Sequence, residues 1–392
     1  MVTTKQGLTV LLQRLARSLN SKVYTVFIFL SFFTTRTDAQ QRIVETINSN
    51  WNFYKGDTTK INRSVWEKIS LPHTWNAIDV MDDEPGYYRG VGWYKKKLYI
   101  NPSWKGKDVS VYFEGASQVA EVFINGRSVG HHIGGYTFFS FNVSRYLNFD
   151  NNSVNEIAVR VDNSYNEDIP PLTADFTFYG GIYRDVYLIA ANPVHFDVDN
   201  YATNGIFIST PLVTAEKASI EVKGALVNTS SLTRKLLLTT TITDNSGNKV
   251  ILKQSELTPS ALQKIAFTES FKNIDRPHLW SPEKPYLYTV VCTLTDAATK
   301  QQLDEISNPL GFRWFEFTAD KGFFLNGKSY KLIGASRHQD FKDLGNALPD
   351  ALHVRDVTLL KEMGGNFLRV AHYPQDPAVL QTCDRLGILA SV

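Results

Sequence analysis

Apolar and polar residues alternate along most of this chain in short runs of the kind that β-strands produce. Before residue 194 such runs, separated by turn residues, span 92–100, 108–113, 119–124, 156–161 and 184–189. The pair Asn125-Gly126 lies between two of these runs and is a strong signal for a hairpin turn. Many short strands with intervening turns are typical of a jelly-roll sandwich, which we predict for residues 40–193.

A second series of alternating runs follows. It comprises 206–209, 218–226, 234–243, 264–270 and 286–293. The number and length of these runs fit an immunoglobulin-like β-sandwich, which we predict for residues 194–313. A second Asn-Gly pair, Asn326-Gly327, then predicts another hairpin.

From residue 330 the pattern changes to strand, helix, strand, helix, strand, with strands expected at 330–336, 366–370 and 388–392. The first helix is expected over 351–363, with an apolar stripe formed by Val354, Val357, Leu360 and Met363. Gly364 is placed to end it.

Asp376-Pro377 can cap and open the second helix of this region. That helix is expected to bury Val379, Cys383 and Leu386 before it ends at Gly387. Strands that alternate with helices form parallel sheets, so we predict that residues 314–392 are the start of an incomplete TIM barrel. The fold class is therefore multidomain β plus α/β.

The first 39 residues differ from the rest of the chain. They carry five Lys/Arg, one Asp and an apolar run over 23–33 that is too short to cross a bilayer. This pattern predicts a signal peptide, a secreted or periplasmic protein, and no transmembrane span after cleavage. The remaining chain has 36 basic and 38 acidic side chains, so its charge gives no support for nucleic-acid binding.

The chain has two cysteines, Cys292 and Cys383, in different predicted domains. Cys383 lies on the apolar stripe of a predicted helix, which favours buried free thiols over a disulfide. A cysteine-based metal or redox site is not expected.

Several short segments, taken in order, carry a family resemblance. They are Leu71–Asn76, Tyr88–Tyr94, Gly135-Tyr136, Asp175–Val186, Leu279–Pro282, Pro285–Tyr288, Gly311–Arg313, Phe324–Lys328, Gly334–His338 and Asn366–Pro374. With them the chain resembles glycoside hydrolase family 2, the β-galactosidases, β-glucuronidases and β-mannosidases, over residues 50–392. The resemblance implies a sugar-binding jelly roll, an immunoglobulin-like sandwich and a barrel that holds the active site.

The resemblance also implies the reaction, which is retaining hydrolysis of a β-glycosidic bond by two carboxyl groups. In the family the acid/base glutamate follows an asparagine on a later barrel strand. Here no Asn-Glu pair occurs after residue 320, and Asn155-Glu156 and Asn166-Glu167 fall in the predicted jelly roll. We therefore expect both catalytic glutamates to be absent from this chain.

By the same resemblance, His338 and His372 would bind the hydroxyls of the terminal sugar. Arg369 would orient carboxylates from later strands, and Asp175 would bind sugar hydroxyls, with or without a sodium ion. Some relatives use Na⁺ or Mg²⁺, so either is a candidate cofactor. His73, His131 and His132 are interpreted as structural, and Arg337 fits either role.

The expected partner is a carbohydrate, and a homo-oligomer is compatible with the sequence. Asp175 and the His-Thr-Trp-Asn segment at 73–76 favour hydrolysis of terminal β-D-galactosides. A β-glucuronidase or another family 2 β-glycosidase is the alternative. A non-catalytic carbohydrate-binding fragment is the third interpretation.

Overall fold

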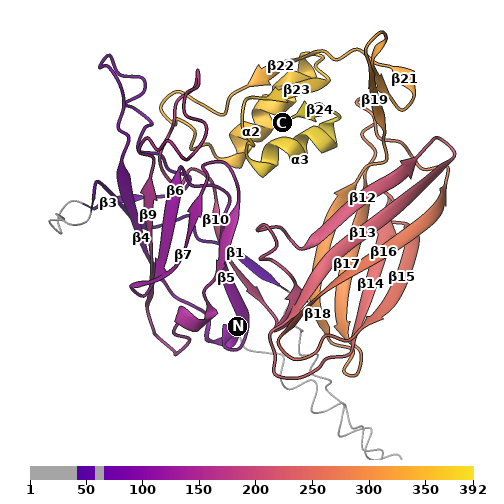
Figure 1. Ribbon diagram of the computed structural model, residues 1–392, viewed down its shortest axis with the longest axis horizontal. Coiled ribbons are helices and arrows are strands. Elements are labelled where there is room, and N and C mark those ends of the chain that lie inside the picture. Colours follow the sequence, from indigo (N-terminus) through magenta and orange to yellow (C-terminus); the bar gives the residue numbers. More distant parts are fainter. Residues whose placement is uncertain (1–41, 58–65) are drawn as a thin grey trace, which may run out of the picture. The chain divides into compact units, whose positions relative to one another are not determined.

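The computed structural model describes residues 42–57 and 66–392 (Figure 1). The predicted signal peptide lies outside these residues. Within them the fold confirms the predicted class, with two β-sandwiches followed by the first strands and helices of a barrel. No helix of the described residues is long and apolar enough to span a membrane.

The first sandwich is built from two antiparallel sheets. One has the order β1 (Ile43–Thr46), β10 (Val186–Ala191), β5 (Asp108–Phe113), β8 (Phe139–Asn142). The other has the order β3 (Glu67–Ile69), β2 (Trp51–Lys55), β4 (Val91–Leu98), β9 (Asn155–Asp162), β6 (Val119–Ile124), β7 (Arg127–Ile133). Short 3₁₀ turns at Pro102–Trp104 and Ser144–Tyr146 lie between strands. Side chains of both sheets share one apolar core.

The turn between β6 and β7 is the predicted Asn-Gly hairpin. Asn125 and Gly126 both have positive φ, at 51° and 76°. These are the backbone angles that a two-residue turn requires, which explains why asparagine and glycine stand there.

Aromatic rings pack closely in the core of the first sandwich. The ring of Trp75 stacks on Phe53 at 5.9 Å and is wedged between two glycines. A Cβ added to Gly180 would lie 2.0 Å from this indole, and one added to Gly92 would lie 2.4 Å from it. The two glycines are therefore needed for the close packing of Trp75.

The second sandwich also pairs two antiparallel sheets. One contains β11 (Val194–Phe196), β13 (Lys217–Asn228) and β12 (Ile206–Val213), with β16 (Gln263–Asp275) also paired to β13. The other has the order β15 (Lys249–Leu257), β14 (Leu236–Thr243), β17 (Tyr288–Asp296), β18 (Gln302–Leu310). Strand β14 alternates buried and half-buried residues along its whole length, as a strand with one face in the core must.

A buried ion pair joins the start of the described chain to this second sandwich. Arg42 Nη2 lies 2.7 Å from Asp304 Oδ2, with side-chain exposures of 8% and 1%. The same guanidinium nitrogen donates to the carbonyl of Phe196, and the Phe196 amide donates to Asp304. Each charge therefore has more than one partner.

The last region begins with a three-stranded hairpin sheet, β19 (Phe315–Thr318), β20 (Gly322–Leu325) and β21 (Lys328–Ser329). It continues through β22 (Gly334–Arg337), α2 (Asp350–Glu362), β23 (Phe367–Val370), α3 (Pro377–Leu386) and β24 (Leu389–Ser391). The strands β22, β23 and β24 are parallel neighbours, with Ser336 opposite Arg369 and Arg369 opposite Ser391. Their C-terminal ends therefore share one edge of the sheet.

The helix ends follow the predicted signals, but one predicted core residue is wrong. Asp376 caps α3 by accepting from the Ala378 amide, and Gly387 ends it with φ of 74°. In α2 the buried residues are His353 and Val357, whereas Met363 is 83% exposed. Met363 is the C-cap residue of α2, so its side chain lies beyond the part of the helix that packs on the sheet.

Both cysteines are free and buried, as predicted. Burial raises the pKa of the Cys292 thiol to about 11 and that of Cys383 to about 12. Both thiols are therefore protonated at neutral pH.

Candidate sugar-binding site

Two histidines lie at the shared C-terminal edge of β22 and β23. His338 follows β22, and His372 follows β23, so the parallel pairing brings them together. Their ring centroids are 5.1 Å apart and the planes are nearly perpendicular, at 81°. The two side chains therefore lie next to each other, and their predicted role in binding a sugar stays a prediction.

A loop of the first sandwich reaches the same place. Asp175 Oδ1 lies 3.8 Å from His372 Nε2, and the Asp175 side chain is 85% exposed. The neighbouring ring of Phe176 lies 6.0 Å from His338, 6.2 Å from His372 and 5.0 Å from Tyr373. The structure thus places Asp175, His338 and His372 around one accessible surface.

Arg369 does not join this group. It lies within β23, and its Nη1 donates to the carbonyl of Val370 at 2.6 Å. In the described part of the chain no hydrogen bond or ion pair links it to His338 or His372. Its predicted role in orienting carboxylates from later strands stays a prediction.

Asp340 is a further member of the site that the sequence reasoning missed. Its Oδ2 accepts from the Tyr179 hydroxyl at 3.4 Å, while its Oδ1 is buried without a partner in the described residues. The Nδ1 atom of His338 is likewise buried and unpartnered there. Burial raises the pKa of Asp340, while nearby His338 and Arg337 oppose the rise.

Buried polar atoms without partners are costly, and native proteins keep few of them. Asp340 and His338 therefore stand out as polar side chains of this region that each keep one buried atom without a partner among the described residues. The signal was present in the sequence, because Asp340 stands two positions after His338 in the segment that follows β22.

Arg337 supports the segment that carries His372, which we call the His372 loop (residues 371–376). Its guanidinium lies 2.8 Å from Asp356 of α2 and donates to Gln375 Oε1 at 2.6 Å. Gln375 in turn donates to the carbonyls of Arg337 and Ala371. The sequence left the role of Arg337 undecided. In the structure this residue holds the His372 loop to β22 and α2.

The buried His353 completes this network. Its Nδ1 lies 3.1 Å from Arg337 Nη2, and burial together with the charges of Arg337 and Arg184 lowers its pKa to about 3. A neutral imidazole can accept the hydrogen bond that Arg337 donates.

The first sandwich holds the other side of the His372 loop. Arg184, only 1% exposed, donates to the carbonyl of Pro374 at 2.7 Å and to Gln339 Oε1 at 3.3 Å. Tyr136 stacks on Tyr373 with centroids 4.4 Å apart and planes 13° from parallel. The position of His372 therefore depends on contacts with residues far away in sequence.

Four carboxylates are coupled to one another by their charges, and we call them the carboxylate cluster: Glu114, Asp185, Asp350 and Asp376. Burial, with repulsion from the other three, raises the pKa of Glu114 to about 8. Burial raises the pKa of Asp376 to about 6, with further repulsion from Asp350 and Asp185. Arg184 is the cation that opposes both rises.

Within residues 42–57 and 66–392, no group of three or more His, Cys, Asp or Glu side chains is arranged to hold a metal ion. Calcium, however, can combine one or two carboxylates with backbone oxygens and water.

Family comparisons cover nearly the whole described chain. The model of the sugar binding domain of glycosyl hydrolases family 2 matches residues 36–193, and that of glycosyl hydrolases family 2 matches 202–313. The model of the family's TIM barrel domain matches residues 317–390.

Relatives named β-glucuronidase and β-galactosidase both match. A β-glucuronidase of Bacteroides fragilis is 38% identical over 94% of this chain and 52% of its own length. A β-galactosidase of Thermoanaerobacter pseudethanolicus is 34% identical over 89% of this chain and 46% of its own length. The chain thus spans about half the length of these curated relatives.

Solved structures also match this chain over most of its length. A Bacteroides uniformis β-glucuronidase superposes with a TM-score of 0.86 and 45% identity, covering 89% of this chain and 42% of that chain. A calcium binding mutant of Bacteroides uniformis β-glucuronidase 2 matches with a TM-score of 0.83 and 44% identity, covering the same shares. In that mutant two aspartates, 26 positions apart, are replaced by alanine.

Proposed function

This chain belongs to glycosyl hydrolase family 2, and from that premise we propose that it forms the sugar-binding side of an exported β-glycosidase that removes terminal β-glucuronic acid. The observation that carries the proposal is the convergence of Asp175, His338 and His372, with an unpartnered oxygen of Asp340 beside them. Export rests on the signal peptide predicted for residues 1–39.

The proposed contribution of this chain is binding and orientation of the terminal sugar. His338 and His372 donate hydrogen bonds to ring hydroxyls, and Asp340 and Asp175 accept them. Because these groups are fixed at a strand end or held by Arg337 and Arg184, a sugar with a misplaced hydroxyl leaves a buried group unpaired. Retaining hydrolysis needs two carboxyl groups about 5 Å apart, and these would come from later barrel strands.

The sequence favoured galactosides, but the comparisons shift the preference. The relatives named β-glucuronidase reach 38% and 45% identity, against 34% for the named β-galactosidase. We therefore place β-glucuronides first and β-galactosides second.

We further propose that the carboxylate cluster binds calcium. Asp350 and Asp376 lie 26 positions apart, the same spacing as the two aspartates replaced in the calcium binding mutant. Each begins or caps a barrel helix, and repulsion within the cluster would be relieved by a divalent cation. A cation bound there would brace the His372 loop, which ends at Asp376.

The function is tested by expressing the whole reading frame that contains this chain and assaying it on 4-nitrophenyl β-D-glucuronide and β-D-galactoside. We expect the glucuronide to be hydrolysed faster, and His372→Ala or Asp340→Asn to lower kcat/KM by about 100-fold or more. His278→Ala, at an exposed histidine of the second sandwich, is the matched control. Full activity in His372→Ala, or no hydrolysis of either substrate, would refute the proposal.

Calcium binding is tested separately, by isothermal titration of CaCl₂ into the 392-residue chain. We expect one site that is lost in Asp350→Asn together with Asp376→Asn and kept in Asp343→Asn. Equal calcium affinity in all three proteins would rule out the carboxylate cluster as the site.

A further inference from the structure

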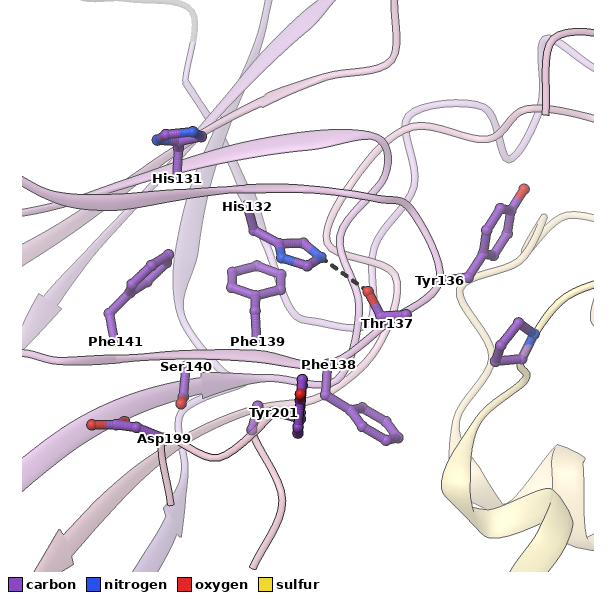
Figure 2. Close-up of a pocket in the computed structure, with 12 residues that line it drawn as sticks. His131, His132, Tyr136, Thr137, Phe138, Phe139, Ser140, Phe141, Asp199 and Tyr201 are labelled. Carbon is purple, nitrogen blue, oxygen red and sulfur yellow. Dashed lines mark hydrogen bonds between the residues drawn. The ribbon is translucent and has the colours of Figure 1, made fainter. Parts of the chain in front are cut away.

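A second concave surface lies beside the first sandwich. It encloses about 630 Å³ and combines β7, β8, the connection that follows β11, and one residue of the His372 loop. Figure 2 shows its side chains, which include His132, Phe138, Ser140, Asp199 and Tyr201, and Pro374 completes the wall. We call it the tyrosine groove. Its volume is in the range of small-molecule sites.

Two aromatic rings are presented to solvent in this groove. Tyr201 is 84% exposed and Phe138 is 36% exposed, so a ligand can reach both rings from solvent. Tyr201 and the following Ala202 both have left-handed backbone, with φ of 54° and 50°. Two adjacent residues other than glycine in this region are strained, and such strain tends to persist where it serves a function.

Polar side chains line the groove together with the rings of Tyr201 and Phe138. His132 Nε2 lies 3.1 Å from Thr137 Oγ1, and the Ser140 hydroxyl donates to the carbonyl of Val198. Burial, with repulsion from Asp197, raises the pKa of the Asp199 carboxyl. The described lining contains no lysine or arginine, so the groove does not fit an anionic ligand.

A neutral sugar fits this combination. One face of a hexose ring carries C–H groups that pack on an aromatic ring, and its hydroxyls satisfy carboxylates and histidines at the rim. A lipid or an apolar peptide would leave Asp199 desolvated and unpaired, which is costly.

A pair of stacked rings joins the groove to the surface around Asp175, His338 and His372, which we call the histidine site. Tyr136 lines the groove and stacks on Tyr373, whose ring also neighbours His338 and Phe176. Pro374 lines the groove two positions after His372. A ligand in the groove and a sugar at the histidines would therefore contact the same loop.

We propose that the tyrosine groove is a second carbohydrate site, which binds neutral hexose units of the glycan whose terminal sugar occupies the histidine site. The assignment of the terminal sugar rests on the proposed function, but binding in the groove does not require the missing catalytic groups. The predicted substrate is therefore a polysaccharide or long oligosaccharide with neutral units behind its terminal residue.

The test is affinity electrophoresis of the 392-residue chain in native gels that contain laminarin, β-1,4-galactan or xyloglucan, with hyaluronan as the acidic comparison. We expect at least one neutral polysaccharide to retard the chain. Tyr201→Ala should weaken that binding by about tenfold or more, and Tyr201→Phe should preserve it. Tyr99→Ala, at a 74% exposed tyrosine outside the groove lining, is the matched control.

His372→Ala separates the two proposals. Retained polysaccharide binding in His372→Ala, with binding lost in Tyr201→Ala, supports the groove even if the chain binds neither glucuronide nor galactoside. Loss of polysaccharide binding in His372→Ala but not in Tyr201→Ala would overturn it. So would stronger retardation by hyaluronan than by every neutral polymer, or no retardation by any of them.

Discussion

Replacing Arg184 by methionine would remove the main polar tether between the first sandwich and the His372 loop. The arginine is 1% exposed and donates to four acceptors. These are the carbonyl of Pro374 at 2.7 Å, that of Glu114 at 3.2 Å, Gln339 Oε1 at 3.3 Å and the carbonyl of Tyr136 at 3.4 Å. Methionine keeps much of the side-chain volume, so the change mainly removes charge and hydrogen bonds.

The magnitude follows from these contacts. The short bond to Pro374 is a charged hydrogen bond in a buried site, worth about 1.5–3 kcal/mol, and the three longer bonds add less each. Arg184 also offsets the charge of Asp376, which would be left with one cation fewer. We expect a loss of about 3–5 kcal/mol, as for other buried charges whose partner is removed.

The assay combines urea unfolding with hydrogen exchange read at residues 371–377. Arg184→Met should lower the free energy of unfolding and speed exchange in the His372 loop more than in β14 of the second sandwich. Arg145→Met, at a residue whose guanidinium contacts only Tyr146 among the described residues, is the control. A loss below about 1 kcal/mol, or equal changes in both variants, would refute the reasoning.

Three further predictions follow from single groups. Burial lowers the pKa of His73 to about 4, below the ordinary value of 6.5, so the unfolded chain takes up the proton first. The free energy of unfolding is therefore highest above pH 6.5 and falls by about 2 kcal/mol between pH 6.5 and 5. Urea titrations of His73→Gln should show no such fall. Gly180→Ala would push a Cβ into Trp75 and should cost about 1–3 kcal/mol in thermal unfolding, partly restored by Trp75→Phe; an unchanged melting temperature would contradict the packing. Cys292 and Cys383 should not react with a thiol reagent at pH 8 until denaturant is added, and rapid labelling of native protein would show the burial to be wrong.

Local patterns predicted most of the strands and the helix ends. The alternation in β14, the Asn125-Gly126 turn and the Asp376-Pro377 start of α3 each depend on a few neighbouring residues, which the sequence displays directly. The proximity of His338 and His372 could be predicted because each follows a strand of the same parallel sheet. Met363 was misplaced because periodicity does not show where a helix passes the edge of its sheet.

The rest of the site depends on contacts that no local pattern encodes. Arg184 reaches Pro374 across 190 positions, and Tyr136 meets Tyr373 only because the sandwich packs beside the barrel strands. Asp340 was missed although it follows His338 closely, because its unpartnered oxygen becomes informative only when its surroundings are known. Strands such as β15 and β18 were missed because their exposed faces carry many polar residues.

The ion pair between Arg42 and Asp304 limits how far the N-terminus can be trimmed. The Asp304 side chain is only 1% exposed, so removal of Arg42 would leave a buried carboxylate without its cation and cost about 3–5 kcal/mol. Cleavage after residue 39, as the leader predicts, leaves Arg42 in place with two residues before it. A maturation or expression boundary only a few residues later would weaken the second sandwich, more than 250 positions downstream.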